Sequence, residues 1–270
     1  MIRIGCAGWA LPVALQPEFP VAGSHLERYA GRLNACEINS SFHRLHSAAT
    51  YARWAGSVPQ DFRFGAKLAR AMTHEARLGG CAPLLDEFMA QVQGLGDRLG
   101  CLLVQLQPSL TFDEAVAGDF FPALRERYSG AVALEPRHAS WFTREVDAWL
   151  AKRSIARVLA DPVRHDAGRA PGGWPGIVYL RLHGSPRMYY SAYDDELLQA
   201  LAARLRQAAA QSQDVWCIFD NTAGQAAAGN ALSLTRLLDL ADENAHTRHS
   251  RAGGDPGVGA PAPGFPPARE

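Results

Sequence analysis

The sequence lacks an excess of charge of either sign, and it lacks any long apolar run. Its 270 residues include 27 Lys and Arg and 27 Asp and Glu, so the formal net charge at pH 7 is zero. A chain without a net positive field has no general attraction for nucleic acid or for an anionic membrane surface, although this balance still permits a local basic pocket. No run reaches the roughly 18 apolar residues of a transmembrane helix. We therefore expect no nucleic-acid partner and no membrane partner.

Cysteine is rare, and its spacing gives no indication of pairing. The five cysteines are an odd number and include no CxxC pair. Cys6, Cys36, Cys101 and Cys217 lie in or beside apolar runs, where a cysteine is usually a buried reduced thiol. The chain also begins directly on an apolar run, with no signal peptide before it. These features predict a reducing compartment and a cytoplasmic protein.

Two cofactor signatures are missing as well. The loop after the first apolar run, Gly5-Cys-Ala-Gly-Trp9, does not complete the GxGxxG fingerprint of a dinucleotide-binding sheet. The sequence contains no HxH or HExxH spacing, so it gives no direct indication of a metal site. We therefore predict no obligatory cofactor and keep a divalent metal as an alternative.

The sequence does contain a regular alternation of short apolar runs with helical patterns. The apolar runs are bounded by turn residues, as expected for strands buried on both faces. The expected strands are 2–8, 35–42, 62–68, 101–107, 131–136, 156–161, 177–183 and 215–220. The first expected helix begins at Ser24. The other expected helices cover 47–56, 83–99, 113–128, 143–152, 194–211 and 223–240. Eight strands alternating with helices predict an α/β fold, a single (β/α)8 TIM-like barrel, with an open doubly wound sheet as the alternative.

Two segments fall outside this alternation. Residues 162–176 form a long irregular connection after a strand, and we interpret them as a lid over the active face. Residues 244–270 are rich in Pro, Gly and Ala and contain few large apolar side chains. They predict a disordered tail that follows a barrel domain of residues 1–243.

Polar and charged side chains stand at the ends of most of the expected strands. Side chains alternate along a strand, so Glu135 and Arg137 point to one side, as do Arg181 and His183. Burying an unpaired charge costs several kcal/mol, so packing alone gives no reason to place charges there. In a parallel barrel the carboxyl ends of the strands share one face, and that face holds the active site. The pattern predicts a polar site at this face, with a purely structural network of ion pairs as the alternative interpretation.

The residue types indicate the chemistry of such a site. Arg137, Arg181 and Lys67 would hold a carboxylate or phosphate group. Glu135 is the expected acid/base with His183 as its partner, and Lys67 would form a Schiff base only if its pKa were lowered. The predicted catalytic residues are Glu135, His183 and Lys67. The predicted substrate-binding residues are Trp9, Glu37, Asn39, Arg137, Trp141, Asp161, Arg181, Tyr193 and Asn221.

Six short motifs are similar to those of one known family. They are Ile4-Gly-Cys-Ala-Gly-Trp9, Glu37-Ile-Asn-Ser-Ser-Phe42, Phe64-Gly-Ala-Lys67, Glu135-Pro-Arg-His-Ala-Ser-Trp141, Arg181-Leu-His-Gly184 and Phe219-Asp-Asn-Thr222. Through them, residues 2–240 resemble the YecE-like family, also called domain of unknown function 72. Many relatives carry asparagine where this chain has Asp220. The resemblance implies a TIM-like barrel and supports the location of the site, but it implies no reaction.

Three functions are compatible with these observations. The first is an enzyme that acts by acid/base chemistry on a small anionic or polyhydroxylated substrate. The second is a metal-dependent sugar isomerase or phosphoester hydrolase, with ligands drawn from Glu37, Glu135, Asp161, His183 and Asp220. The third is a non-catalytic protein that binds a metabolite. All three have a small-molecule ligand as partner, and none specifies an oligomeric state.

Overall fold

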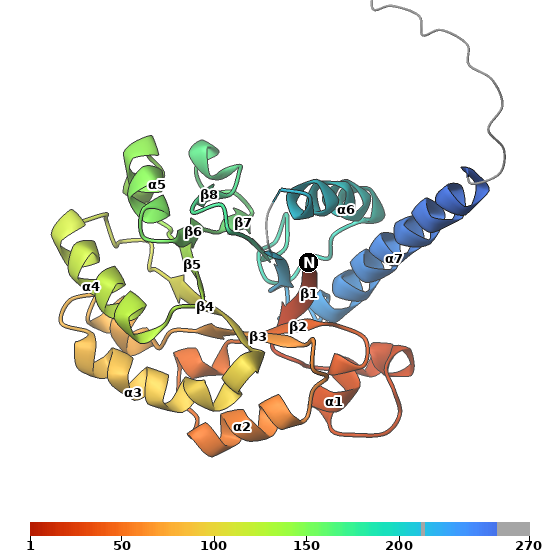
Figure 1. Ribbon diagram of the computed structural model, residues 1–270, viewed down its shortest axis with the longest axis horizontal. Coiled ribbons are helices and arrows are strands. Elements are labelled where there is room, and N and C mark those ends of the chain that lie inside the picture. Colours follow the sequence, from red (N-terminus) through yellow and green to blue (C-terminus); the bar gives the residue numbers. More distant parts are fainter. Residues whose placement is uncertain (212–213, 253–270) are drawn as a thin grey trace, which may run out of the picture.

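A ring of mostly parallel strands forms the centre of the molecule, and helices cover its outside (Figure 1). The computed structural model describes residues 1–211 and 214–252, with side chains described as far as residue 239. The strands are β1 (Ile2–Ala7), β2 (Ala35–Ile38), β3 (Arg63–Lys67), β4 (Leu99–Gln105), β5 (Ala131–Glu135), β6 (Ile155–Arg157), β7 (Leu159–Asp161), β8 (Gly172–Gly173), β9 (Ile177–Leu182) and β10 (Asp214–Phe219). Their order in the sheet is β7-β9-β10-β1-β2-β3-β4-β5-β6-β8.

The sixth strand of the barrel is broken into two short pieces. β6 pairs with β5, and β7, which follows after one residue, pairs with β9 on the other side. Val158 lies between the two pieces and donates its N–H to the carbonyl oxygen of Leu134 at 2.8 Å. These pairings nearly close the ring, so the TIM-like barrel predicted from the sequence is confirmed. The expected strand 156–161 corresponds to β6 and β7 together.

The seven helices of the described residues are α1 (His25–Ala30), α2 (Ala48–Gly56), α3 (Ala82–Val92), α4 (Glu114–Arg127), α5 (Arg144–Ala151), α6 (Asp195–Ala209) and α7 (Ala227–Ala252). Five of the seven begin at a residue whose side chain accepts a backbone N–H, namely α1, α2, α4, α5 and α6. Ser24 and Glu27 form a complete capping box at the start of α1, as the sequence predicts. Ser47 and Asp194 accept backbone N–H groups at the starts of α2 and α6. Within the described residues, no helix is long and apolar enough to cross a membrane.

Three elements differ from expectation by more than two residues at one or both ends. The expected strand 35–42 ends at Ile38 and continues into a 3-10 turn at Ser40–Phe42. The expected helix 83–99 ends at Val92 and continues as a 3-10 segment, Gln93–Arg98, within which Gly96 has φ +51° and is not helical. Helix α7 starts at Ala227 rather than 223 and runs to Ala252, past the expected domain end at residue 243. The remainder of the expected tail, 253–270, lies outside the described residues.

Strict alternation of side chains divides the buried residues between two cores. The core inside the barrel consists of Ala35, Cys101, Leu103, Ala133, Ala156, Val158, Ile177, Tyr179, Trp216 and Ile218. The neighbouring strand positions, such as Cys36 and Leu102, pack outward against the helices. All five cysteines are free and buried, which agrees with the expectation for Cys6, Cys36, Cys101 and Cys217. The same alternation turns Glu37, Lys67, Glu135 and Arg181, near the carboxyl ends of their strands, toward the barrel axis.

Candidate functional site

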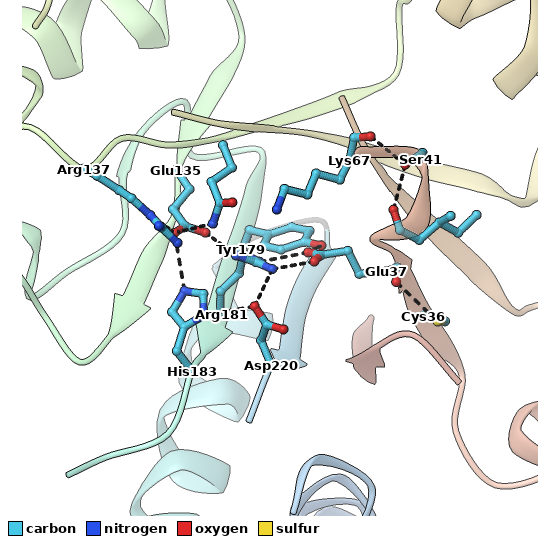
Figure 2. A network of polar contacts seen from close by, with 12 residues as sticks. Cys36, Glu37, Ser41, Lys67, Glu135, Arg137, Tyr179, Arg181, His183 and Asp220 are labelled. Carbon is cyan, nitrogen blue, oxygen red and sulfur yellow. Dashed lines mark hydrogen bonds and ion pairs between the residues drawn. The ribbon is translucent and has the colours of Figure 1, made fainter. Parts of the chain in front are cut away.

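Arg181, at the carboxyl end of β9, is the centre of a buried polar cluster (Figure 2). Its Nε and Nη2 atoms donate to the two carboxylate oxygens of Glu37 at 3.0 and 2.6 Å. Its Nη1 atom donates to Glu135 at 2.5 Å, and Nη2 also donates to Asp220 at 2.9 Å. The Arg181 and Glu37 side chains are fully buried. One guanidinium group therefore joins carboxylates from β2, β5 and the end of β10.

The contacts of Arg181 leave few of its N–H groups available to a ligand. A guanidinium group has five N–H donors, and Arg181 uses four of them on protein carboxylates. Removing a carboxylate from water is costly unless a cation and hydrogen bonds replace the water. Arg181 meets this requirement for three carboxylates at once. Its contacts match the structural alternative considered from the sequence, and at most one of its N–H groups is available to a ligand.

Glu135, at the end of β5, is held as an anion. Its Oε1 atom accepts hydrogen bonds from Gln105 at 2.9 Å and from Arg137 at 3.2 Å, and its Oε2 atom accepts from Arg181. Burial alone would raise the pKa of this carboxyl group, but the charges of Arg181, His183 and Arg137 outweigh burial and hold the pKa well below its usual value. A carboxylate with so low a proton affinity is a weak general base.

His183 stands between two carboxylates at the rim of the cluster. Its Nδ1 atom lies 3.1 Å from Asp220, and its Nε2 atom lies 3.4 Å from Glu135 without a hydrogen-bond partner in the described structure. Burial lowers the pKa of the imidazole, but the charge of Glu135 and the hydrogen bond to Asp220 reverse this effect, so the pKa lies above its usual value. The ring is thus fixed by Asp220 through Nδ1, and its Nε2 atom faces Glu135 at ion-pair distance.

Lys67 enters the cluster from the end of β3, and its ammonium group points toward Arg181 and Glu135 in Figure 2. The Nζ atom lies 4.1 Å from the centre of the Phe42 ring, and the residue is 8% exposed. Burial, followed by the charge of Arg181, lowers the pKa of Lys67 to about 8. Among the described residues, no carboxylate lies within ion-pair distance of this ammonium group.

The loop after β9 covers the cluster with Tyr189. This residue has φ +68°, an uncommon conformation for a residue other than glycine. Its N–H donates to the carbonyl oxygen of His183, and its ring packs edge-on against the imidazole at 5.6 Å. Burial lowers the pKa of Arg137, but the charge of Glu135 and, after it, Tyr189 outweigh burial and raise this pKa. Strained backbone in such a position is often associated with function.

Three of the expected substrate-binding residues instead hold this loop in place. The Tyr193 hydroxyl donates to Asp161 at 2.7 Å and accepts from the N–H of Gly184 at 2.8 Å. Asn221 donates to the carbonyl oxygen of Ser191 at 2.9 Å. The side chains of Ala160 and Asp220 face the barrel interior. Asp161 and Asn221 are the next residues along the chain, so their side chains face outward.

The two expected tryptophans lie in packed environments. Trp9 packs edge-on against Trp54 of α2 at 5.0 Å and against Phe64 at 6.4 Å. Trp141 is buried and donates its ring N–H to the carbonyl oxygen of Leu110 at 2.9 Å. Asn39 follows Glu37 but has left the extended conformation, and its Oδ1 atom is buried without a partner. Of the twelve expected site residues, the structure brings together Glu37, Lys67, Glu135, Arg137, Arg181 and His183.

Two residues of the site were not identified from the sequence. Tyr179 donates its hydroxyl to Glu37 at 2.9 Å, and its place two residues before Arg181 was the available signal. His74 lies in a π-helical turn, Ala71–Glu75, and packs edge-on against Phe42 at 5.0 Å. Burial and the charges of Lys67 and Arg70 lower the pKa of His74. Its position follows from the path of the loop after β3, for which the sequence carries no periodic signal.

A small cavity lies beside Glu135, Arg137 and His183. Its volume is about 20 Å³, which is room for about one water molecule. Pro162, Val163, Arg164 and Gly168 line its other side, so the segment expected to be a lid borders the site. His165 of this segment lies 3.3 Å from the carbonyl oxygen of Arg137.

The described residues offer no arrangement of three or more His, Cys, Asp or Glu side chains suited to a metal ion. Glu37, Glu135 and Asp220, the carboxylates nearest to one another, are bound by Arg181. An arginine in this position competes directly with a cation for the same oxygen atoms. The geometry therefore gives no support to the metal-dependent alternative.

Comparisons with known proteins identify sequence relatives along nearly the whole chain. The profile of the family described as protein of unknown function DUF72 matches residues 3–253. The UPF0759 protein YecE of Escherichia coli is 28% identical over 167 residues, which cover 60% of this chain and 59% of that relative. This match thus spans less than two thirds of YecE. The UPF0759 protein YunF of Bacillus subtilis is 22% identical, covering 89% of this chain and 95% of YunF.

Two crystal structures of DUF72 family proteins have a similar fold. The protein from Enterococcus faecalis has a TM-score of 0.75 at 20% identity, covering 89% of this chain and 96% of that chain. The protein from Thermotoga maritima has a TM-score of 0.72 at 23% identity, covering 88% of this chain and 99% of that chain. Their similarity supports the barrel architecture.

Proposed function

From the premise that this chain belongs to the DUF72 family, whose function is unknown, we propose that it is an enzyme that performs acid–base chemistry on a small anionic substrate. The reaction takes place at the carboxyl end of the barrel, beside Arg137 and His183. The observation that carries the proposal is the imidazole of His183, held between two carboxylates, with Nδ1 3.1 Å from Asp220 and Nε2 3.4 Å from Glu135. A titratable ring in this place is able to gain or release a proton beside the ionised Glu135.

The charges of the cluster favour an anionic ligand. Glu37, Glu135 and Asp220 contribute three negative charges, whereas Arg181, Arg137 and Lys67 contribute three positive charges. Protonation of His183 adds one positive charge, so the acid form of the site has a net charge of +1. An excess charge in a poorly hydrated site is costly, and an anion removes that cost.

The side chains support distinct roles. Arg137 uses its Nε atom on Glu135 and has guanidinium N–H groups left for a carboxylate or phosphate. His183 supplies or accepts the proton, because it lies between Glu135 and Asp220 and imidazole is the side chain whose ordinary pKa is close to neutral. Glu135 remains ionised and stabilises the charged imidazole. This assignment moves the acid–base role that the sequence favoured for Glu135 to its partner His183.

Ligand binding tests the first half of the proposal. The wild-type protein is screened by thermal unfolding with inorganic phosphate and with panels of small carboxylates, sugar phosphates and neutral sugars. We expect an anionic compound to raise the melting temperature, because a ligand that binds only the folded state stabilises it. Arg137→Gln should lose this response, whereas Arg53→Gln, at an exposed position on α2, should keep it. An equal response in Arg137→Gln would overturn the assignment of the anion site.

Turnover of the stabilising compound tests the second half. Conversion is followed by NMR in the wild type and in His183→Gln. We expect the variant to retain binding and to lose turnover by roughly 10²–10⁴-fold. Binding by the wild type without any conversion would instead support the metabolite-binding alternative.

A further inference from the structure

Lysine is almost absent from this chain, and one of its two lysines lies in the site. Of the 27 basic residues, 25 are arginine, and the two lysines are Lys67 and Lys152. Lys152 is exposed at the end of α5, whereas Lys67 is buried in the polar cluster. Arginine remains charged in proteins, whereas lysine is able to lose its proton and act as a nucleophile. A chain that otherwise uses arginine has thus placed its one buried primary amine at the site.

The surroundings of Lys67 leave its amine unoccupied. The neighbouring carboxylates are bound by Arg181, Arg137 and His183, and the Nζ atom rests on the face of Phe42. Beneath the side chain, Gly65 leaves room for the Tyr179 hydroxyl, which a Cβ atom at this position would approach at 3.0 Å. A lysine that served only to neutralise a carboxylate would be expected to form an ion pair with it.

We propose that Lys67 forms an imine with a substrate that carries an aldehyde or ketone group beside an anionic group. This inference rests on the proposed function and names the substrate class of the same site. The Nζ atom bonds to the carbonyl carbon while the carbonyl oxygen takes up a proton and becomes a hydroxyl group. The hydroxyl group then leaves as water with a second proton, and the carbon–nitrogen double bond forms. The overall change is ammonium plus carbonyl to protonated imine plus water, so no oxidant or reductant is needed.

Three features of the site favour this step. The lowered pKa of Lys67, about 8, leaves a useful fraction of neutral amine near pH 7–8. The anionic group of the substrate has a separate partner in Arg137, so binding does not consume the amine. His183, whose pKa is raised, is the group of the cluster suited to supply the proton that accompanies loss of water.

Reductive trapping tests the proposal in the full chain. The protein is incubated with sodium cyanoborohydride and one of four probes, and modified residues are located by peptide mass mapping. Pyruvate and glyoxylate carry a carbonyl and a carboxylate, glycolaldehyde carries only the carbonyl, and acetate carries only the carboxylate. We expect pyruvate or glyoxylate to label Lys67 at least about tenfold faster than Lys152, with weaker labelling by glycolaldehyde and none by acetate. Modification restricted to Lys152 and the N-terminal amine would overturn the proposal.

Two variants complete the experiment. Lys67→Arg keeps the charge and should abolish the site-specific adduct, whereas Lys152→Arg should leave it unchanged. Because the two lysines are compared within the wild-type protein, the test does not depend on the folding of Lys67→Arg. Anion-dependent stabilisation without an adduct at Lys67 would disprove imine formation and leave the proposed acid–base function standing. Absence of both responses to all anionic compounds would count against both.

Discussion

The two ends of the barrel interior each contain a buried arginine, but they treat it differently. At the amino-terminal end, Arg3 of β1 pairs with Asp214 of β10 at 2.8 Å and lies over the Trp216 ring at 5.6 Å. At the carboxyl-terminal end, Arg181 meets three carboxylates and is completely buried. Arg63 lies close enough to both members of this pair to be affected by their charges, but none of the described residues at this end joins three carboxylates as Arg181 does.

The informative difference is that the upper, carboxyl-terminal end contains further charged and titratable side chains. Arg137, His183 and Lys67 add further charged or titratable groups around a cluster that Arg181 already holds together. Buried ionic groups are weak contributors to stability, because the cost of removing them from water offsets most of their attraction. Stability alone therefore gives little reason to gather so many of them around one arginine. The additional groups at the upper end are the ones that the proposed function uses.

The largest expected effect is a difference in stability between variants of the two arginines. Arg181→Met leaves three buried carboxylates without their common cation, and we expect it to lower the free energy of unfolding by about 3–5 kcal/mol or to prevent folding. Arg3→Met removes one pair whose aspartate side chain is 26% exposed, and we expect a loss of about 1–2 kcal/mol. Urea unfolding followed by circular dichroism measures both. Equal losses would mean that the two ends are held by equivalent interactions.

A smaller effect is expected at Gly65, which lies between the two ends. A Cβ atom there would approach the Tyr179 hydroxyl at 3.0 Å and the Trp216 ring at 3.7 Å. Gly65→Ala should destabilise the protein by about 1–3 kcal/mol, because the Tyr179 hydroxyl must move away from Glu37. Gly118→Ala is the matched control in α4, where a Cβ atom meets nothing within 4 Å. That variant should stabilise by about 0.5–1 kcal/mol, and opposite signs in urea unfolding would confirm the tight packing around Gly65.

The smallest expected effect is the pH dependence contributed by His183. Its pKa in the folded protein is raised, so the protonated ring stabilises the fold. This contribution is fully present below the unfolded value of about 6.5 and is lost as pH rises through the folded pKa. His183→Gln should remove this component from the dependence of unfolding free energy on pH.

NMR titration of the imidazole signals gives the direct measurement. His183 should titrate above its ordinary value, whereas His46 and His74, whose pKa values are lowered chiefly by burial, should titrate below it. A normal or lowered value for His183 would contradict its placement between Asp220 and Glu135. The two other histidines serve as internal controls in the same spectrum.

Local pattern was sufficient to predict much of this structure. Each expected strand overlaps an observed one, and the capping box at Ser24 is present because its atoms lie three residues apart. The pairing of Glu135 with Arg137 follows from alternation along one strand. The outward direction of Asp161 and Asn221 was missed, because alternation gives two sets of residues without stating which set faces the barrel axis.

Sequence by itself determined that charged side chains would gather at the carboxyl ends of parallel strands. This follows because short-range periodicity defines the strands, and the parallel barrel places their ends on one face. Only the tertiary structure decided which charges meet. Arg181 and Glu37 are 144 residues apart, and barrel closure alone brings them into contact. The tertiary structure also decided that three carboxylates bind Arg181, while the amine of Lys67 forms no ion pair. Both outcomes depend on distances between residues that are far apart in the sequence, and no local pattern contains those distances.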